Sequence, residues 1–310
     1  MPTVLILLAA YNGSAYLRRQ IDSILTQDYS RWHLILSDDR SSDDTLDILT
    51  HYANSMPDKI TLYRSGRHFG NAQDHFLHLL TKFQDADYLM FCDQDDVWHP
   101  DKIRITLEKM RALETDPSIP TLVHTDLRVV DQSLRELDPS FLHYSGLDGN
   151  CLSLNRLLIQ NVVTGCTAMI NASLARTVCE SLPKQNIIMH DWFLAVLAAA
   201  SGKIGFLNDA SVDYRQHGQN TVGAKNSRSL SYLRSRLSQR IIRASIFSGA
   251  RQAEAILSSY GRYIPEDNRE ILRAFASLPQ KSYFVRRYIY LKYGFFKHGL
   301  ARCVALFLFG

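Results

Sequence analysis

The sequence predicts an α/β fold with a mainly parallel central sheet and a helical C-terminal extension. Short apolar runs alternate with helical patterns over the first 220 residues, which is typical of a parallel sheet covered by helices on both faces. From about Ser229 onward the pattern is helical throughout, with basic residues between apolar ones. We therefore expect an α/β domain over residues 1–220 and a basic, aromatic-rich helical region over 221–310.

The first half of the chain supplies four expected strands and the helices between them. The strands are Val4–Ala9, 33–37, 60–63 and 88–92, and the helices contain residues 17–25, 43–52 and 71–83. The second strand ends in Asp38 and Asp39, after which Ser41 or Ser42 can cap a helix with two acids in its first turn.

The second half continues the alternation with one interruption. A helix can begin at Pro100, and Asn171 and Gly202 are placed to cap a helix start and a helix end. The segment 131–160 has no clear pattern and is expected to form a loop over the site. The remaining expected strands are 122–125, 128–130, 165–170, 204–207 and 212–214, and the remaining apolar helix is 193–200.

Composition indicates an ordinary globular chain. Of its 310 residues, 46% are hydrophobic and 21% are charged, which argues against disorder. The five cysteines are widely spaced and form no C-x-x-C pair, so a reducing cytoplasm is favoured over a disulfide framework or a zinc site. The apolar run Val4–Ala10 is too short to span a membrane and lacks the preceding positive charges of a signal peptide.

Three carboxylates within four residues follow the fourth expected strand. Asp93, Asp95 and Asp96 come directly after an uncharged run that suits a strand buried on both faces. The carboxyl ends of parallel strands form the edge at which open α/β sheets bind ligands. Carboxylates this close repel one another unless a hard cation neutralises them. We expect a divalent metal site here, the alternative being an acidic turn that caps the helix after Pro100.

The chain has no glycine-rich motif of the kinds that bind phosphate. Neither G-x-G-x-x-G after the first strand nor a Walker lysine motif is present, so a dinucleotide fold and a P-loop are not supported. A metal on Asp93 and Asp95 would instead bind a diphosphate, with positive charge from Arg67 and His68 in a nearby loop. Each of those two residues is also compatible with an ordinary surface position.

Four motifs, in this order, resemble the family 2 inverting glycosyltransferases of GT-A fold. They are Ala10-Tyr11-Asn12-Gly13, Asp38-Asp39-Arg40-Ser41, Asp93-Gln94-Asp95-Asp96 and His190-Asp191-Trp192, and the likeness covers about residues 3–220. The sequence most resembles the bacterial rhamnosyltransferase-like branch that builds surface polysaccharides such as O-antigen. The resemblance implies a nucleotide-sugar donor, with L-rhamnose from dTDP as the leading choice, and a catalytic domain over residues 1–220.

The resemblance also implies a nucleotide-binding set at the first two motifs. Ala10, Tyr11, Asn12, Asp38 and Asp39 match positions that hold the nucleotide, one aspartate typically accepting a hydrogen bond from the base. Many relatives have a threonine where this chain has Ala10, so a hydroxyl contact is lost there. Base preference is therefore left open.

The later motifs are implied to hold the metal and the general base. Asp93 and Asp95 match the D-x-D carboxylates that reach Mn²⁺ or Mg²⁺, while Asp96 either contacts the donor sugar or supports the loop. His217 is either a further metal ligand or a structural histidine. Asp191 matches the base that takes the acceptor hydroxyl's proton, although a helix-start acid has the same pattern.

His190 departs from the Glu-Asp pair that the family more often shows at this position. It either hydrogen-bonds to Asp191 and orients it, or caps the helix. The Gln-x-x-Arg-Trp signature of processive synthases is absent, so we expect transfer of one sugar per encounter. Two other function classes stay open from sequence: a nucleotidyltransferase that releases pyrophosphate, and a non-catalytic, membrane-associated binding module.

The C-terminal region is strongly basic. From Thr221 to Gly310 it has 16 Lys+Arg against 4 Asp+Glu, and its aromatic residues interleave with basic ones. We expect peripheral contact with an anionic membrane, at the inner face of the cytoplasmic membrane, a lipid-linked saccharide acceptor and no nucleic-acid partner. Packing of the aromatic residues on the body is the alternative. The aromatic residues are Tyr283, Phe284, Tyr288, Tyr290, Tyr293, Phe295 and Phe296.

Overall fold

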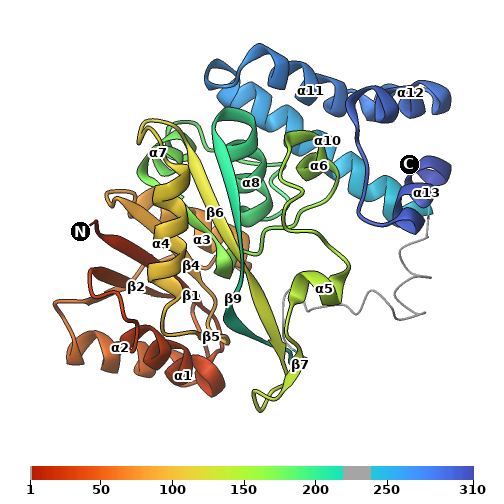
Figure 1. Cartoon of the computed structure of the whole chain (residues 1–310). Helices are drawn as coiled ribbons and strands as arrows, with labels where there is room; N and C mark the ends of the chain where they lie inside the picture. The colour runs from red at the N-terminus through yellow and green to blue at the C-terminus, as the bar shows by residue number, and fades with distance from the viewer. Residues whose placement is uncertain (1, 219–238) are drawn as a thin grey trace.

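The computed structural model describes residues 2–218 and 239–310, and these form a nine-stranded sheet flanked by helices (Figure 1). The strands are β1 (Val4–Ala10), β2 (Trp32–Asp38), β3 (Ile60–Tyr63), β4 (Tyr88–Cys92), β5 (Val97–Trp98), β6 (Thr121–Val130), β7 (Glu136–Asp138), β8 (Met169–Asn171) and β9 (Lys203–Arg215). The helices of the body are α1 (Ser14–Leu25), α2 (Thr45–Ser55), α3 (Ala72–Lys82), α4 (Lys102–Leu113), α5 (Phe141–Ser145), α6 (Leu154–Ile159), α7 (Ala172–Glu180) and α8 (His190–Ser201). The C-terminal helices are α10 (Gln239–Tyr260), α11 (Glu266–Ala276), α12 (Tyr283–Tyr293) and α13 (Leu300–Phe309), and 3₁₀ turns lie at η1 (Gly165–Thr167), η2 (Gly261–Tyr263) and η3 (Leu278–Gln280).

The sheet has the strand order β3-β2-β1-β4-β8-β6-β9-β5, with β7 paired to β6. Its first four strands are all parallel, as the sequence predicts. Strand β8 runs antiparallel to both β4 and β6, while β6 and β9 are parallel to each other. The α/β fold with a mainly parallel sheet and C-terminal helices is thus confirmed, since the long ladders are parallel, while the short β8 adds an antiparallel strand in the middle of the sheet.

Strands β6 and β9 are each continuous where the sequence predicts two short strands. The register of their pairing shifts at Asp126, so the bulge absorbs the polar residue that interrupts the apolar pattern. The Asp126 carboxylate accepts hydrogen bonds from the Ser140 hydroxyl and the Leu142 backbone N–H. The expected loop 131–160 supplies these partners, since it contains β7, α5 and α6 rather than irregular chain alone.

Several element boundaries differ from the expected ones. Helix α2 begins at Thr45, so neither serine caps it, and Asp43 lies before the helix, where its carboxylate accepts from the Thr45 N–H. Helix α8 begins at His190 with Met189 as N-cap, three residues earlier than predicted. The expected strand 165–170 is the turn η1 followed by the short β8. Asn171 caps α7 and Gly202 ends α8, as predicted.

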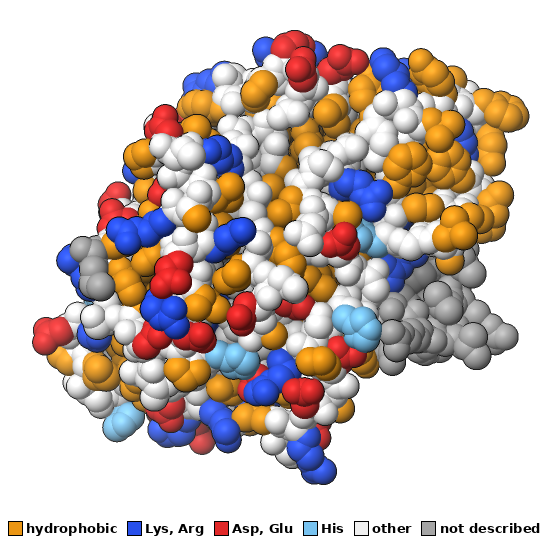
Figure 2. Space-filling model, viewed as in Figure 1, with side chains coloured by type: hydrophobic (Ala, Val, Ile, Leu, Met, Phe, Trp, Pro, Cys, Tyr) orange, Lys and Arg blue, Asp and Glu red, His pale blue; other side chains and the backbone are white. Residues whose placement is uncertain are grey.

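Some aromatic side chains of the C-terminal region are buried and others are exposed. Tyr290 and Phe295 of the expected aromatic set are buried, as is the neighbouring Arg286, so this part of the region packs on the body. Phe284 and Tyr288 remain exposed, and Figure 2 shows hydrophobic side chains gathered over α12 and α13 at the upper right. None of the helices in 2–218 or 239–310 is long and apolar enough to cross a bilayer.

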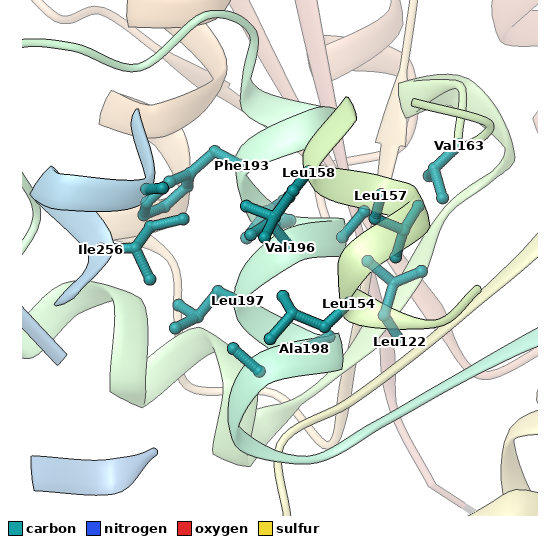
Figure 3. Packing of buried hydrophobic residues seen from close by; sticks show 14 of the residues in the cluster. Leu122, Leu154, Leu157, Leu158, Val163, Phe193, Val196, Leu197, Ala198 and Ile256 are labelled. Carbon is teal, nitrogen blue, oxygen red and sulfur yellow. The ribbon is translucent and has the colours of Figure 1, made fainter. Parts of the chain in front are cut away.

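Alternating residues of β1 belong to two hydrophobic clusters, one on each face of the sheet. Val4, Ile6 and Leu8 pack with residues of α1, α2 and α4, whereas Leu5 and Leu7 belong to the cluster on the other face. That second cluster includes α8 and extends into α6 and the C-terminal helices, as Figure 3 shows for Phe193, Leu158 and Ile256. The C-terminal helices and the α/β body therefore share one core.

The expected domain boundary at residues 220 and 221 lies outside the described residues, as does the expected helical start near Ser229. The division into two domains stays a prediction. What the described residues establish is the shared core, because α10 contacts both α6 and the turns η2 and η3.

Candidate functional site

A cleft of about 650 Å³ lies beside the carboxyl ends of β1 and β4. One wall holds Ala10 at the end of β1 with Tyr11 after it, Asp39 after β2 and the acidic loop after β4. The opposite wall comes from the chain around residues 159–165 and the start of α8, and side chains of α10 and α13 close one end. The cleft is therefore built jointly by the parallel half of the sheet and the C-terminal helices.

The first turn and the acidic loop are clamped together by Gln94. The Tyr11 backbone N–H donates to Gln94 Oε1 at 2.7 Å, and Gln94 Nε2 donates back to the Tyr11 carbonyl at 3.0 Å. A Cβ at Gly13 would lie 2.2 Å from Gln94 Oε1, so only glycine allows this approach. The Tyr11 side chain is half exposed at the cleft, with its ring 6.1 Å from that of His68. Gln94 lies within the acidic motif, but a glutamine at this position in the sequence does not predict that it joins the two loops.

Asn12 and Asp38 hold the loops rather than line the cleft. The Asn12 N–H donates to Ser41 Oγ at 2.8 Å, and Asn12 Oδ1 accepts from the Ser42 N–H at 2.8 Å. The Asp38 carboxylate accepts from the backbone N–H and the hydroxyl of Ser41. Asn12 has a φ of 48°, a left-handed conformation that asparagine tolerates better than most residues. These contacts fix the turn that carries Tyr11.

Asp39 reaches the cleft and organises the loop after β3. Its carboxylate accepts from the Phe69 N–H at 2.6 Å and the Gly70 N–H at 2.8 Å, and His68 Nδ1 lies 3.2 Å from it. Arg67 of the same loop is exposed and lies outside the cleft lining. These three contacts fix the loop after β3 against Asp39. The same loop contributes Gly70 to the cleft lining.

Asp93 and Asp95 face the cleft beside Asp191. Desolvation, together with the negative charges of Asp95 and Asp191, raises the pKa of Asp93 to about 7. His217 Nε2 lies 2.6 Å from Asp95 Oδ2, and the His217 ring packs 4.8 Å from that of Tyr16. Two carboxylates and an imidazole are ligands that suit Mn²⁺, and the carboxylates suit Mg²⁺. The donor types of these residues therefore suit a divalent cation, which would relieve the crowding of negative charge.

Asp96 lies beneath the acidic loop, fully buried, and is absent from the cleft lining. Its Oδ1 accepts from the Arg215 N–H at 3.2 Å. Asp93, Asp96 and Cys166 each offer a ligand atom within 4.8 Å of the others. Burial, together with the negative charge of the neighbouring aspartates, raises the pKa of both Asp96 and Cys166 well above their usual ranges. Of the two roles expected for Asp96, this position matches support of the loop.

Lys102, which the sequence did not single out, is fully buried below the same loop. Its ammonium donates to Ser211 Oγ at 3.3 Å and lies 4.8 Å from the centre of the Trp98 ring. Burial lowers its pKa to about 8. A lysine at the first position of an amphipathic helix normally signals an exposed residue, so no sequence pattern reveals this one.

Asp191 lies in the first turn of α8 and lines the cleft. Its Oδ1 accepts from the Trp192 N–H at 2.5 Å and from Asn161 Nδ2 at 3.3 Å, and its Oδ2 accepts from the Gly165 N–H at 3.1 Å. Desolvation raises the pKa of this carboxyl to about 7, although the backbone N–H donors act in the opposite direction. The arrangement holds a carboxylate in fixed orientation with a proton affinity suited to general base catalysis.

His190 takes neither of the two roles expected from the sequence. Met189 is the N-cap, and neither ring nitrogen of His190 has a hydrogen-bond partner within the described part of the chain. The ring packs 4.6 Å from that of Phe76 and 5.4 Å from that of Phe91. Burial lowers its pKa to about 3, so the imidazole is neutral. The His190 ring packs among aromatic side chains next to Asp191.

The structure brings most of the predicted residues together. Those that line the cleft are Ala10, Tyr11, Asp39, Asp93, Asp95 and Asp191, and His217 contacts Asp95 directly. Those outside the lining are Asn12, Asp38, Arg67 and Asp96. Asn12, Asp38 and Asp96 support loops of the cleft, whereas Arg67 lies on the surface.

The sequence profile of glycosyl transferase family 2 matches residues 5–177, which is more than half of the chain. The chain belongs to glycosyl transferase family 2. The matched range contains three of the four motifs and ends before Asp191, so the base position is not part of that match. The predictions of a glycosyltransferase and of the GT-A fold are confirmed.

Curated relatives of this family 2 enzyme include two bacterial proteins. The dTDP-rhamnosyl transferase RfbG of Shigella flexneri is 27% identical over 235 residues, covering 73% of this chain and 77% of that protein. The putative glycosyltransferase EpsE of Bacillus subtilis is 35% identical over 104 residues, covering 33% of this chain and 36% of that protein.

Solved glycosyltransferases share the fold. TarS of S. aureus in complex with UDP has a TM-score of 0.58 and 15% identity, covering 88% of this chain and 70% of that chain. The mannosyltransferase PcManGT of Pyrobaculum calidifontis, with GDP-Man and Mn²⁺, has a TM-score of 0.50 and 17% identity, covering 94% of this chain and 86% of that chain. At these identities the likeness extends to the fold alone.

Proposed function

We propose that this glycosyltransferase is metal-dependent and inverting, and that it moves a single sugar from a nucleotide diphosphate donor to a lipid-linked polysaccharide acceptor. The observation that carries the proposal is that Asp191 lines the same cleft as Asp93 and Asp95. The proposed base and the proposed metal-binding pair therefore face one shared cleft. One base and one metal suffice for inversion, in contrast to the two carboxylates of a glycosidase.

The donor end of the cleft is the wall that holds Ala10, Tyr11 and Asp39. The half-exposed Tyr11 ring offers an apolar face to a nucleobase, and Asp39 holds the neighbouring loop in place. We propose dTDP-L-rhamnose as the donor, supported by the likeness to RfbG. Ala10 offers no hydroxyl to the base.

Asp93 and Asp95 would hold Mn²⁺ or Mg²⁺, with His217 as a third ligand. When bound, the cation neutralises charge on the departing nucleoside diphosphate. The neighbouring side chains keep these ligands in place, since Arg215 donates to the Asp95 carbonyl at 2.8 Å.

Asp191 would accept the proton of the attacking acceptor hydroxyl. The oxygen then forms a bond to the anomeric carbon while the bond to the diphosphate oxygen breaks on the opposite face. The Gly165 N–H and the Asn161 side chain hold the carboxylate toward the cleft. The proton stays on the Asp191 carboxyl until it is released to solvent after the transfer. Nucleotidyl transfer and a purely structural acid cluster, both open from sequence, are disfavoured by the family assignment.

The experiment that tests donor and metal binding is a thermal-shift panel. Wild-type protein is measured with UDP, dTDP, GDP and CDP, each with and without Mn²⁺ or Mg²⁺. We expect one nucleotide to stabilise the protein only with metal, and Asp95→Asn to lose that stabilisation by at least about tenfold in apparent affinity.

The matched control is Asp209→Asn, which removes an exposed carboxylate on β9 that does not line the cleft. It is expected to respond as the wild type does. Equal stabilisation of Asp95→Asn and wild type would remove Asp95 from the metal site.

A further inference from the structure

Two C-terminal helices expose apolar side chains at helical spacing. Phe284 and Leu300 are each 82% exposed, and they belong to a group of exposed apolar side chains rather than standing singly. Figure 2 shows this apolar surface over α12 and α13. We define the apolar ridge as Phe284, Tyr288, Leu291, Leu300, Val304 and Leu308, all of them exposed.

The chain that carries the apolar ridge has positive charge and no negative charge of its own. Residues 281–310 contain six Lys or Arg and no Asp or Glu. Lys281 and Lys292 are exposed beside the ridge, and Arg287 stacks on the Tyr283 ring at 3.6 Å. The acid nearest in the contacts is Glu270 of α11, 3.6 Å from Lys292. The complementary partner is therefore negatively charged.

Helix α13 presents the apolar ridge on one face and the cleft on the other. Arg302, Ala305 and Leu306 line the cleft, whereas Leu300 and Val304 point away from the body. At 3.6 residues per turn these two sets lie on opposite sides of the helix. A surface that binds the ridge would thus lie directly beside one end of the cleft.

We propose that the apolar ridge docks the enzyme on an anionic lipid bilayer, with α12 and α13 in the headgroup region. Short amphipathic helices with an apolar face and basic flanks bind at this depth, and tyrosine is favoured there. A second copy of the chain fits less well, because two acid-free segments of equal positive charge would face each other. The proposal deepens and rests on the proposed function, since it brings a lipid-linked acceptor to the cleft.

Docking through this surface gives the acceptor a defined route. The saccharide would enter the cleft past α13, where Lys297 and Arg302 belong to the lining. With the ridge in the headgroup region, these cations would be placed to meet the phosphate groups of a lipid carrier. The donor wall with Tyr11 and Asp39 faces the cleft from the β-sheet side, so donor and acceptor approach from different directions.

Vesicle flotation with the full chain tests the docking surface. The probes are vesicles of phosphatidylcholine alone and of phosphatidylcholine with phosphatidylglycerol. We expect wild-type protein to float with the anionic vesicles and far less with neutral ones, and the double variant Phe284→Glu with Leu300→Glu to lose at least about tenfold in partitioning. The control Leu137→Glu adds the same charge at an exposed leucine of β7 and should float like the wild type.

Thermal unfolding and nucleotide binding of the double variant accompany the flotation. Both should match the wild type, because neither substituted side chain lines the cleft. Wild-type protein that stays unbound from anionic vesicles, or a double variant that floats equally well, would overturn the docking surface. So would light scattering that finds a dimer which the double substitution dissociates. Flotation as expected without any nucleotide binding would support the docking surface and count against the proposed function alone.

Discussion

Asp191 is the residue at which desolvation and fixed orientation coincide. Its two oxygens accept hydrogen bonds from Trp192, Gly165 and Asn161, and desolvation raises its pKa to about 7. A base with a proton affinity near the working pH can take a proton in the transition state and release it afterwards. The sequence predicted this residue from motif order, but its environment depends on Gly165 and Asn161, which lie far from it along the chain and had no signal of their own.

The raised pKa of Asp191 predicts the direction of a pH dependence. Only the ionised carboxylate accepts the acceptor's proton, so kcat/KM should rise with pH through about 7 and then level off. The profile is measured at saturating metal, because Asp93 also has a raised pKa when no cation neutralises it. A rate that is independent of pH from about 5 to about 9 would count against Asp191 as the base.

Among elements, the turn η1 and the start of α8 form the side of the cleft that carries Asp191, the proposed base. Gly165 lies against His190, and a Cβ there would come within 2.6 Å of His190 Nε2 and 3.7 Å of Asp191 Cβ. The sequence predicted one strand from Gly165 to Ile170, because the run is uncharged and ends in apolar residues. Such a pattern gives no information about the close approach of Gly165 to His190. Helix α8 and its Gly202 end were predictable because caps and periodicity are local.

Gly165→Ala tests the contact between η1 and α8. The added methyl should push His190 and, with it, the Asp191 carboxylate, lowering kcat by about 10²-fold while donor affinity changes little. Steady-state kinetics and donor titration separate these effects. Gly261→Ala is the control, because its Cβ meets Leu257 at an ordinary 3.9 Å. Unchanged kcat in Gly165→Ala would show that the base tolerates this displacement.

At the scale of the whole molecule, the C-terminal helices complete both the core and the cleft. Phe193 and Leu197 of α8 belong to the same hydrophobic cluster as Ile256 and Tyr260 of α10. The sequence predicted helices there from composition and periodicity. It did not predict their place, because packing between segments so far apart in the chain leaves no local pattern. The reversed β8 escaped prediction for the same reason, since strand direction follows from tertiary packing.

Removal of residues 239–310 should therefore leave an unstable body rather than an independent catalytic domain. The deletion exposes the apolar side of α8 and opens one end of the cleft. We expect a soluble yield far below that of the full chain and no cooperative thermal unfolding by circular dichroism. A truncated chain that melts within about 5 °C of the full chain would contradict the shared core.

The most direct measurement of the central claim is turnover by Asp191→Asn, using the nucleotide sugar whose nucleotide gives metal-dependent stabilisation. Release of nucleoside diphosphate with acceptor present is compared with donor affinity from calorimetry in the same preparations. We predict that the variant loses about 10²- to 10⁴-fold in kcat while its donor affinity stays close to that of the wild type. Turnover within about tenfold of the wild type, at equal donor affinity, would contradict Asp191 as the general base of an inverting transfer.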